Sequence, residues 1–269
     1  MMLHAALIGH PVIHSLSPAI HTYWMDRHGV EGAYGLIDTA GQGLPETIKD
    51  MVAQNYNGFN VTLPHKQAVM DFCDHVDDTA RLMGAVNTVH IRDGKCYGSN
   101  TDAYGFVQSL LQADPEQHYL NGRIVVLGAG GAARAVVYGL REAGAKDIIV
   151  CNRTLDRAKG LSAHICPWEE RSRILAGAAL LVNTTSLGMQ GQDKLDIDLA
   201  ALPATALVCD IVYKPRETKL LQAAAAQGCR TVDGLGMLLQ QAARAFSVWT
   251  GITPEITDEL RDMLKARTL

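Results

Sequence analysis

The sequence predicts an α/β protein that combines a small α/β domain with a doubly wound domain of parallel strands and helices. Two observations predict this class. Short apolar segments recur along the chain, with helix-forming or polar stretches between them. From residue 123, RIVVLGAGGAARAVVYGLREAGAKDIIVCNRT has the pattern of a strand, a glycine turn, a helix and a second strand. This is one βαβ unit of the expected length.

Composition limits the classes to which the chain can belong. Its 269 residues are 48% hydrophobic and 19% charged, enough to bury a sizeable core in one large or two modest domains. The net charge of −4 comes without a basic run, which argues against a nucleic-acid partner. The first residues lack the charged start of a signal peptide, and no apolar run approaches the roughly 20 residues of a membrane span. We therefore expect no membrane partner.

The six cysteines are scattered without a C-x-x-C pair. In a chain of this length they indicate reduced thiols in the cytoplasm. His10, His14 and His21 cluster near the start, but no cysteine or acidic residue nearby completes a ligand set. We therefore expect no metal site.

The first 55 residues contain two predicted strands and two predicted helices. Residues 5–11 form a short apolar strand that ends in Gly-His-Pro, and YGLIDT at 34–39 forms a second strand. Between them a hydroxyl-rich turn leads into a helix, with Ser17 as its N-cap and Pro18 at its first position. LPETIKDMVAQN at 44–55 is an amphipathic helix.

Residues 59–63 alternate apolar and polar side chains, which predicts a strand with Asn60 and Thr62 on its polar face. Pro64 ends this strand and suits the first turn of a helix, which QAVMDF continues. Lys66 then lies in the first turn, where the helix dipole disfavours a cation. This placement indicates a functional role, because a snorkelling surface lysine would leave the position at a helix start unexplained.

Further along, TVHI and KCYG flank an Asp-Gly pair, which predicts a hairpin over 88–98. A helix followed by a polar linker over 102–122 indicates a domain boundary. Beyond the βαβ unit, ALLVNTT and ALVCDIV continue a run of parallel strands joined by helices. Near the end, 235–249 form a helix with one apolar stripe. Gly251 stops this helix, and Thr253-Pro254-Glu255 caps a last one.

The glycine turn at 128–133 matches G-x-G-x-x-A in the required place, after an apolar strand and at the opening of a helix. Glycines there permit a tight turn, and free N–H groups at the helix start face a diphosphate. The complete βαβ context makes this a strong prediction of a dinucleotide site. Its residues are Gly128, Ala129, Gly130, Gly131 and Ala132.

The end of the next strand decides which dinucleotide binds. An NAD-specific site usually has an acidic residue there to hold the ribose 2′-hydroxyl. This chain has Asn152-Arg153-Thr154 followed by Arg157, and two guanidinium groups suit a 2′-phosphate. The alternative is a solvated basic face at a helix start. We predict NADP as the cofactor.

Several polar residues outside this site are oddly placed for solubility alone. They are Ser15, Ser17, Asn60, Thr62, Asn87, Asn100, Asp102 and Gln241. Singly, each is more often a turn former, a cap or a core amide. Together they predict a pocket for a small polyhydroxylated molecule that exchanges a hydride with the cofactor.

Nine motifs, in the same order along the chain, resemble those of the shikimate dehydrogenase family. They are Gly9-His10-Pro11 with HSLSPAIH, NVTLPHK, GAVNT, GSNTDAYG, GAGGAARA, NRTLDR, NTTSLGM, DIVYKP and DGLGMLLQQA. The resemblance implies a substrate domain of residues 1–102 with 237–269, an NADP-binding Rossmann domain of 103–236, and an active site in the cleft between them. It also implies reversible reduction of 3-dehydroshikimate to shikimate with NADPH, in the route to aromatic amino acids.

The resemblance implies roles for individual residues. Lys66 and Asp102 are the implied catalytic pair. A helix start beside a cofactor that becomes cationic on oxidation would help Lys66 to shed and regain a proton. Ser15 and Ser17 are implied to hold the substrate carboxylate. The other implied substrate contacts are Thr62, Lys66, Asn87, Asp102, Tyr213 and Gln241. The implied cofactor contacts are Gly128 to Ala132, Asn152, Arg153, Thr154 and Arg157, with Ile211, Gly234 and Met237 beside the nicotinamide.

Three alternatives stay open at this point. A quinate or quinate/shikimate dehydrogenase shares most of these motifs, but that subgroup often has a threonine at the second serine and an acid at the end of the second nucleotide strand. Ser17 and Asn152-Arg153 therefore favour shikimate and NADP. The other two are a paralogue acting on another small hydroxy acid and a catalytically silent NADP-binding sensor or structural partner. Both a monomer and a homodimer are compatible with the sequence.

Overall fold

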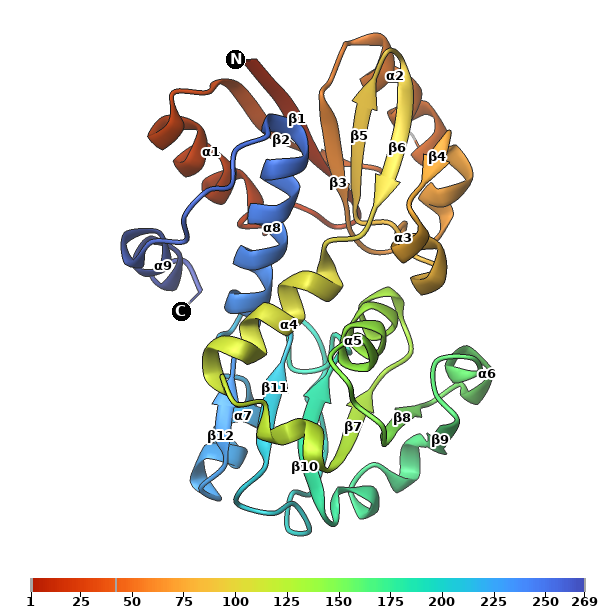
Figure 1. The fold of residues 1–269 in the computed structure, drawn as a ribbon, viewed down its shortest axis with the longest axis vertical. Coiled ribbons are helices and arrows are strands. Elements are labelled where there is room, and N and C mark those ends of the chain that lie inside the picture. Colours follow the sequence, from red (N-terminus) through yellow and green to blue (C-terminus); the bar gives the residue numbers. More distant parts are fainter. Residues whose placement is uncertain (1, 42, 269) are drawn as a thin grey trace. The chain divides into compact units, whose positions relative to one another are not determined.

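Two compact units make up the chain in the computed structural model, which describes residues 2–41 and 43–268. Unit 1 comprises Met1–Thr101 with Gln241–Leu264, and unit 2 comprises Asp102–Gln240 with Lys265–Leu269 (Figure 1). The chain thus changes unit after residues 101 and 240, where the prediction has 102 and 236, and its last residues group with unit 2. The assignment of substrate to one domain and NADP to the other stays a prediction.

A six-stranded mixed sheet forms the centre of unit 1. β1 is parallel to β2 and β3, whereas β5 is antiparallel to β3 and β6, and β4 is parallel to β6. The strand order is β2-β1-β3-β5-β6-β4. The strands are β1 (Met2–Gly9), β2 (Glu31–Asp38), β3 (Gly58–Val61), β4 (His75–Val76), β5 (Thr88–Arg92) and β6 (Lys95–Ser99). The predicted hairpin is confirmed, because Asp93 and Gly94, both at positive φ, join β5 to β6.

Helices supply the rest of the unit 1 core. Ile48 and Met51 of one helix pack with Phe59 and Val61 of β3 in one hydrophobic cluster. A second group consists of aromatic rings in stacked, tilted and edge-on contact, which are His21, Trp24, Tyr34, Phe246 and Trp249. The helices of this unit are α1 (Ser17–His28), α2 (Leu44–Ala53), α3 (Asp78–Met83), the second half of α8 (Gly234–Thr250) and α9 (Asp258–Lys265).

The predicted α-helix after Pro64 is wrong. The segment instead forms a short 3₁₀ helix, Ala68–Phe72, and Lys66 lies in the turn before it. In an α-helix the Lys66 carbonyl would accept a bond from Met70 N. Here it accepts one from Val86 N at 2.7 Å, while Met70 N bonds to Gln67 O at 3.2 Å. The α-helix dipole therefore does not explain the position of Lys66.

Two predicted helix starts are also wrong. Ser17 is the first residue of α1, and Leu16 before it is the N-cap. The Ser17 N–H donates to Ser15 Oγ at 3.2 Å. The last helix begins at Asp258, several residues after Thr253. Thr257 caps it by accepting a bond from Leu260 N at 3.2 Å. The predicted end of α8 is confirmed at Gly251, whose φ is 73°.

Unit 2 contains a fully parallel six-stranded sheet in the order β12-β11-β10-β7-β8-β9. This is the strand order of a doubly wound dinucleotide-binding fold, as predicted. In such folds the ligand binds beyond the carboxyl ends of the strands where the order reverses, here between β7 and β10. The strands are β7 (Arg123–Leu127), β8 (Ile148–Asn152), β9 (His164–Pro167), β10 (Ala178–Asn183), β11 (Leu207–Asp210) and β12 (Arg230–Val232).

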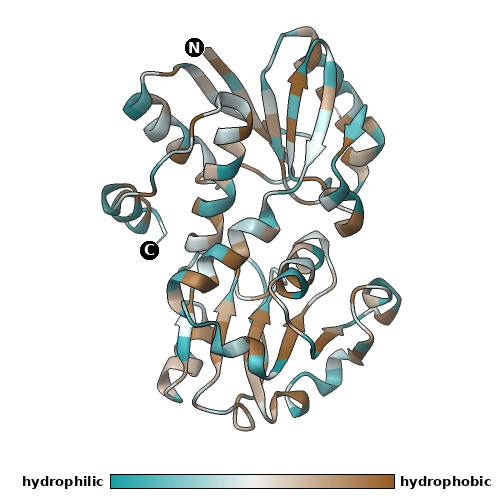
Figure 2. Ribbon diagram, in the orientation of Figure 1, coloured by the Kyte–Doolittle hydropathy of each residue, from teal (hydrophilic) through white to brown (hydrophobic). Residues whose placement is uncertain are grey.

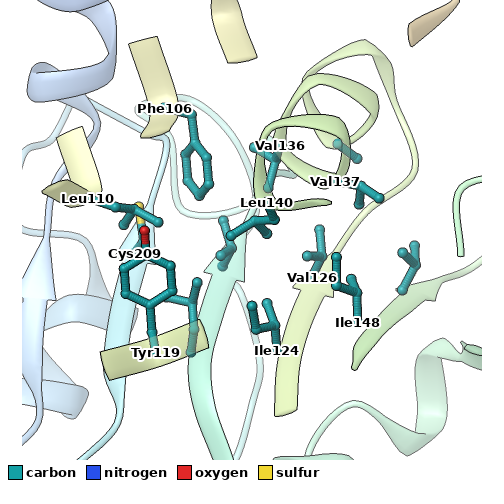
Figure 3. Close-up of a cluster of buried hydrophobic side chains, with 14 of the residues drawn as sticks. Phe106, Leu110, Tyr119, Ile124, Val126, Val136, Val137, Leu140, Ile148 and Cys209 are labelled. Carbon is teal, nitrogen blue, oxygen red and sulfur yellow. The ribbon is translucent and has the colours of Figure 1, made fainter. Parts of the chain in front are cut away.

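Both faces of this sheet are covered. On one face, Phe106 of α4 (Asp102–Ala113) and Leu140 of α5 (Gly131–Glu142) pack with Ile124 and Val126 of β7 (Figure 3). On the other face lie the leucines of α7 (Lys219–Ala226) and of the β10–β11 connection. Strands covered on both faces are nearly continuous apolar runs, which appear brown in Figure 2.

The prediction that helices join these strands is wrong for one connection. Residues 184–206, between β10 and β11, contain no helix. Gly188 and Gly191 adopt left-handed φ values of 89° and 81°, which interrupt a helix. Leu195 and Leu199 of this connection are nevertheless buried, so an irregular loop covers the sheet where a helix usually does. The short strands β9 and β12 were not among the predicted elements.

Candidate active site

The loops that follow β1, β2 and β3 are tied together at the carboxyl edge of the unit 1 sheet. Gly9 O accepts bonds from Thr39 N at 3.0 Å and from Thr39 Oγ1 at 3.1 Å. His10 N donates to Leu63 O at 2.9 Å. A Cβ on Gly9 would overlap Thr62 Cγ2, so only glycine permits this close approach. The Gly-His-Pro motif therefore fixes the position of Thr62.

The turn that carries Lys66 is held from two sides. The Lys66 carbonyl accepts the bond from Val86 N, and the neighbouring His65 Nε2 lies 2.7 Å from Thr39 Oγ1. Burial, together with the charge of His10, lowers the pKa of His65, so this imidazole is neutral at pH 7. The half-buried Lys66 side chain thus starts from an ordered backbone, which suits a group that must meet a substrate in one geometry.

Asn87 is the centre of a polar cluster in unit 1. Its Oδ1 accepts bonds from Thr101 N at 2.8 Å and from Thr88 Oγ1 at 2.9 Å. Its Nδ2 donates to Thr101 Oγ1 at 3.0 Å and lies 3.4 Å from Gln241 Oε1. The structure thus brings together Asn87 and Gln241, which were predicted, and adds Thr88 and Thr101. Each added threonine directly follows an asparagine of a motif singled out in the sequence, and that adjacency was the signal for it.

Ser15 and Ser17 lie together at the start of α1, where Ser15 Oγ donates to Ser17 Oγ at 3.1 Å. Nearby in the same unit, the Tyr34 hydroxyl donates to Asn60 Oδ1 at 2.7 Å. Asn60 Nδ2 in turn donates to Thr88 Oγ1 at 3.0 Å. Sequence reasoning missed Tyr34, because an aromatic residue on a strand carries no signal beyond core packing.

Asp102 is the first residue of α4 and only 4% of it is exposed. A carboxylate at that position complements the helix dipole. Asp102 belongs to unit 2 and Lys66 to unit 1, so their catalytic pairing stays a prediction. Tyr213, a predicted substrate contact, also belongs to unit 2, where it is half-buried in the loop after β11.

The glycine turn lies where the strand order of unit 2 reverses. Gly128 follows β7 with a φ of 106°, and a Cβ there would lie 2.7 Å from Thr184 Oγ1, just beyond β10. Gly130 is the N-cap of α5. Among the described residues no atom lies within 4 Å of a Cβ built on it, and no side chain caps the helix. The first N–H groups of α5, from Gly131 and Ala132 onward, are therefore open to a diphosphate, which these residues fit.

Arg153 and Arg157 follow β8 on the same edge of the sheet. The strand ends at Asn152, whose Nδ2 donates to Thr154 O at 2.7 Å, and α6 (Leu155–Ala158) begins immediately. Both guanidinium groups are exposed, and within residues 2–41 and 43–268 neither forms an ion pair. Two such cations, four residues apart, fit the 2′-phosphate of NADP.

Asp210, at the end of β11, joins the loops that follow β10 and β11. Its fully buried carboxylate accepts bonds from Asn183 Nδ2 at 3.0 Å, Val212 N at 3.1 Å and Thr218 Oγ1 at 2.7 Å. Burial raises the pKa of Asp210 to about 6, and these three bonds act against the rise. The network also holds Ile211, whose N donates to Asn183 O at 3.1 Å.

The three residues predicted beside the nicotinamide lie together in unit 2. A Cβ on Gly234 would overlap Ile211 O, so only glycine fits there, and Met237 packs in the same hydrophobic cluster as Ile211. A cavity of about 310 Å³ lies nearby between the Asp210 loops, but none of the predicted substrate or cofactor residues lines it. We therefore assign no role to this cavity.

Two further searches cover residues 2–41 and 43–268. No group of three or more His, Cys, Asp or Glu side chains in this part of the chain is arranged to hold a metal ion. None of its helices combines the length and apolar character that crossing a membrane requires.

Three family models match the sequence. Residues 7–89 match the shikimate dehydrogenase substrate binding domain, and residues 111–187 match the model described as shikimate / quinate 5-dehydrogenase. Residues 234–258 match the shikimate 5′-dehydrogenase C-terminal domain.

Similar sequences span nearly the whole chain. A protein of Paramagnetospirillum magneticum named shikimate dehydrogenase (NADP(+)) is 48% identical over 264 residues, covering 96% of each chain. A protein of the same name from Azorhizobium caulinodans is 46% identical over 272 residues, covering 98% of this chain and 96% of the relative.

Solved structures agree with this similarity. Shikimate 5-dehydrogenase from Thermus thermophilus, in complex with NADP(H) and shikimate, superposes with a TM-score of 0.87 at 38% identity over all of both chains. Quinate dehydrogenase from Corynebacterium glutamicum, in complex with NAD, superposes with a TM-score of 0.90 at 32% identity, covering 98% of this chain and 99% of the other.

Proposed function

The chain belongs to the shikimate dehydrogenase family, and on this premise we propose that it catalyses the reversible NADPH-dependent reduction of 3-dehydroshikimate to shikimate. This reaction is a step in the biosynthesis of chorismate and the aromatic amino acids. The observation that carries the proposal is a set of polar side chains in unit 1, in which half-buried Ser15 bonds to buried Ser17 and half-buried Gln241 lies beside buried Asn87. Such a set of hydroxyls and amides suits a small molecule with one carboxylate and several hydroxyls.

The proposed substrate contacts divide by chemistry. The hydroxyls of Ser15 and Ser17 donate to the carboxylate, for which two adjacent O–H groups are suitable donors. Asn87 and Gln241 carry amides that both donate and accept, as a ring hydroxyl requires. Thr62 and Tyr213 complete the proposed set of substrate contacts.

Proton handling is assigned to Lys66 and Asp102. When bound, NADPH supplies the hydride to the carbonyl carbon. The carbonyl oxygen then needs a proton, which Lys66 Nζ is proposed to deliver and, in the reverse direction, to remove. Protonation turns this oxygen into a hydroxyl, from which the Asp102 carboxylate is proposed to accept a hydrogen bond.

The proposed cofactor is NADP. The glycine turn of Gly128, Ala129, Gly130, Gly131 and Ala132 holds the diphosphate, and Asn152, Arg153, Thr154 and Arg157 hold the adenosine end. Ile211, Gly234 and Met237 line the proposed nicotinamide site. The support for NADP over NAD is the exposure of Arg153 and Arg157 without ion-pair partners in the described part of the chain.

The proposal extends to the setting in which the enzyme works. A cytoplasmic location is supported by the six cysteines, all of which are free thiols. The proposed partners are the small-molecule substrate and cofactor, with neither nucleic acid nor membrane, for a monomer or a homodimer.

A four-way assay tests the proposed function. Shikimate and quinate are each offered with NADP and with NAD, and reduction of the cofactor is followed by absorbance. We expect kcat/KM to be highest for shikimate with NADP. Quinate with NAD is the second candidate, favoured by the structural similarity to the quinate dehydrogenase of Corynebacterium glutamicum. No turnover in any of the four combinations would contradict both candidates.

A further inference from the structure

Two segments of unit 2 carry the three residues proposed beside the nicotinamide. Ile211 belongs to the loop after β11, whereas Gly234 and Met237 belong to the first turns of α8. The segments meet at Gly234, whose N donates to Val212 O at 3.2 Å and whose lack of a side chain leaves room for Ile211 O. This backbone bond fixes the separation of the segments at Gly234, but one bond does not fix the direction in which α8 leaves that point.

An ion pair joins the same two segments at a second point. Arg216, later in the loop after β11, donates from Nε to Asp233 Oδ2 at 2.7 Å. The other oxygen of this carboxylate, Asp233 Oδ1, accepts a bond from Leu235 N at 3.1 Å. Asp233 directly precedes α8, where such an acceptor caps the helix and a negative charge complements its dipole. The Asp233 carboxylate therefore links the first turn of α8 to the loop.

The pair is also shielded from solvent to a large extent. The Arg216 side chain is 33% exposed and that of Asp233 is 26% exposed. Fully exposed ion pairs contribute little, because water and salt screen them. A short charge-assisted bond between partly buried groups keeps its geometry better, so this pair is suited to holding two segments in one arrangement.

We propose that Arg216 and Asp233 are positioning residues that hold the start of α8 against the loop after β11 and so set the shape of the nicotinamide site. The inference rests on the proposed function, since it concerns the nicotinamide end of the proposed NADP site. Neither residue is assigned a contact with the cofactor. They act through Ile211 in the loop and through Gly234 and Met237 in the helix. The competing role is a contribution to folding stability alone.

Two variants break the ion pair in different ways. Arg216→Met keeps an apolar stem of similar length and removes the donors. Asp233→Asn removes the charge but keeps an oxygen that can accept the bond from Leu235 N, so the helix cap remains. An effect that the two variants share is therefore due to the loss of the ion pair.

The matched control is Arg230→Met, which breaks another ion pair of unit 2. Arg230 Nη1 lies 3.3 Å from Asp114 Oδ1. Arg230 is the first residue of β12, whereas Asp233 directly follows the last residue of that strand. The control pair thus lies at the amino edge of the sheet, away from the carboxyl edge where the cofactor is proposed to bind.

The decisive measurement compares the binding of two ligands by calorimetry. NADP carries the nicotinamide, whereas adenosine 2′,5′-bisphosphate has the adenosine and its 2′-phosphate without the nicotinamide. In Arg216→Met and in Asp233→Asn, the Kd for NADP should rise by about threefold or more while the Kd for the bisphosphate stays constant, because only the nicotinamide end is altered. The double variant should bind NADP no more weakly than the weaker single variant, since both changes remove the same pair. Arg230→Met should change neither Kd.

Steady-state kinetics with shikimate and NADP give a second readout. The value of kcat depends on the alignment of the nicotinamide with the reacting carbon of the substrate, so it should fall by about tenfold or more in Arg216→Met and in Asp233→Asn. The KM for shikimate should change little. Arg230→Met should keep the wild-type kcat.

Equal increases in the two Kd values, or no increase in either, would overturn the inference, as would an unchanged kcat. If Arg216→Met does not fold, Asp233→Asn is judged by the same criteria. Wild-type turnover of shikimate is measured first, and its absence would contradict the proposed function itself. Wild-type turnover together with unchanged NADP binding and kcat in the variants would contradict the positioning role alone.

Discussion

Lys66 is the residue on which the proposed proton transfer depends. Lys66→Ala removes a general acid–base group but only one of several substrate contacts, so kcat should fall by about 100- to 10,000-fold while shikimate binding changes little. Steady-state kinetics with shikimate and NADP measure both quantities. Lys49→Ala, an exposed lysine of α2 in the same unit, serves as the control and should leave both unchanged. Weaker binding of shikimate at unchanged kcat would make Lys66 a binding residue only.

Arg153 and Arg157 are the two residues expected to determine the preference for NADP over NAD. Each charge-assisted bond to a phosphate contributes roughly 1.5–3 kcal/mol, so Arg153→Ala with Arg157→Ala should raise the KM for NADP by about a hundredfold or more. The KM for shikimate and the weak activity with NAD should stay nearly constant. The binding of NADP should also depend less on salt, because two exposed ion pairs are removed.

A matched control for the arginine pair is Lys146→Ala. Lys146 is an exposed cation that precedes β8 and so lies at the opposite edge of the sheet from Arg153. This substitution removes a similar surface charge and should leave the KM for NADP unchanged. Equal losses with NADP and NAD in the arginine double variant would contradict the assignment and indicate damage to the β8–α6 turn.

Among the secondary-structure elements, α5 offers a comparison of two glycines with nearly the same φ, one before the helix and one after it. Gly128 and Gly144 have φ values of 106° and 103°, so alanine at either should destabilise the fold by more than about 1 kcal/mol. A Cβ on Gly128 would press on Thr184 at the proposed diphosphate site, whereas a Cβ on Gly144 meets no atom within 4 Å among the described residues. Gly128→Ala should therefore raise the KM for NADP, and Gly144→Ala should not.

Urea unfolding and NADP kinetics on both glycine variants test this expectation. A similar increase in the KM for NADP in both would mean that loss of stability, and not the shape of the turn, causes the effect. An unchanged KM in Gly128→Ala would place the diphosphate elsewhere.

At the scale of the whole molecule, His21 makes the protein sensitive to acid. Burial lowers its pKa from 6.5 to about 3. The unfolded chain takes up this proton near pH 6.5 and the folded chain does not. The contribution of His21 to stability is therefore present above pH 6.5 and is lost as the pH falls, by about 2–3 kcal/mol at pH 4.5. In His21→Phe, the loss of unfolding free energy between pH 7 and 4.5 should shrink by that amount, as measured by urea unfolding. An unchanged pH dependence would show that His21 is protonated in the folded state.

Asp210 affects the pH dependence of stability in the opposite direction. Burial raises its pKa from 3.8 to about 6, so between these values the folded chain keeps a proton that the unfolded chain has released. Its contribution to stability is fully present below pH 3.8 and is lost as the pH rises through 6. In wild type, acidification from pH 7 to 4.5 should thus add about 2 kcal/mol to the free energy of unfolding through Asp210. Asp210→Asn removes that gain, so this variant should lose more unfolding free energy on acidification than wild type. A loss equal to that of wild type would contradict the raised pKa.

Part of this structure could be predicted from the sequence, because it depends on interactions between residues that are close together in the chain. Gly128 has a positive φ, which favours glycine, and Asp93 and Gly94 have the two positive φ values of the hairpin turn. These residue types therefore indicate the backbone conformation at their positions. The apolar period of 235–249 reports one buried face of α8. The βαβ unit, the hairpin and the family motifs were therefore predictable, because each depends on residues close together in the chain.

Contacts between distant residues decided the rest. Segment 68–72 is a 3₁₀ helix because Val86 N donates to the Lys66 carbonyl, which would accept a bond within the segment if it were an α-helix. The sequence around Lys66 does not predict this contact with Val86. The same holds for the hydrogen bond from Tyr34 to Asn60, 26 residues along the chain. A backbone or side-chain polar group bonds to whichever partner the fold brings within about 3 Å. Sequence periodicity reports which face of an element is buried, whereas the partner of a buried polar group is determined only when the strands of the sheet are assembled.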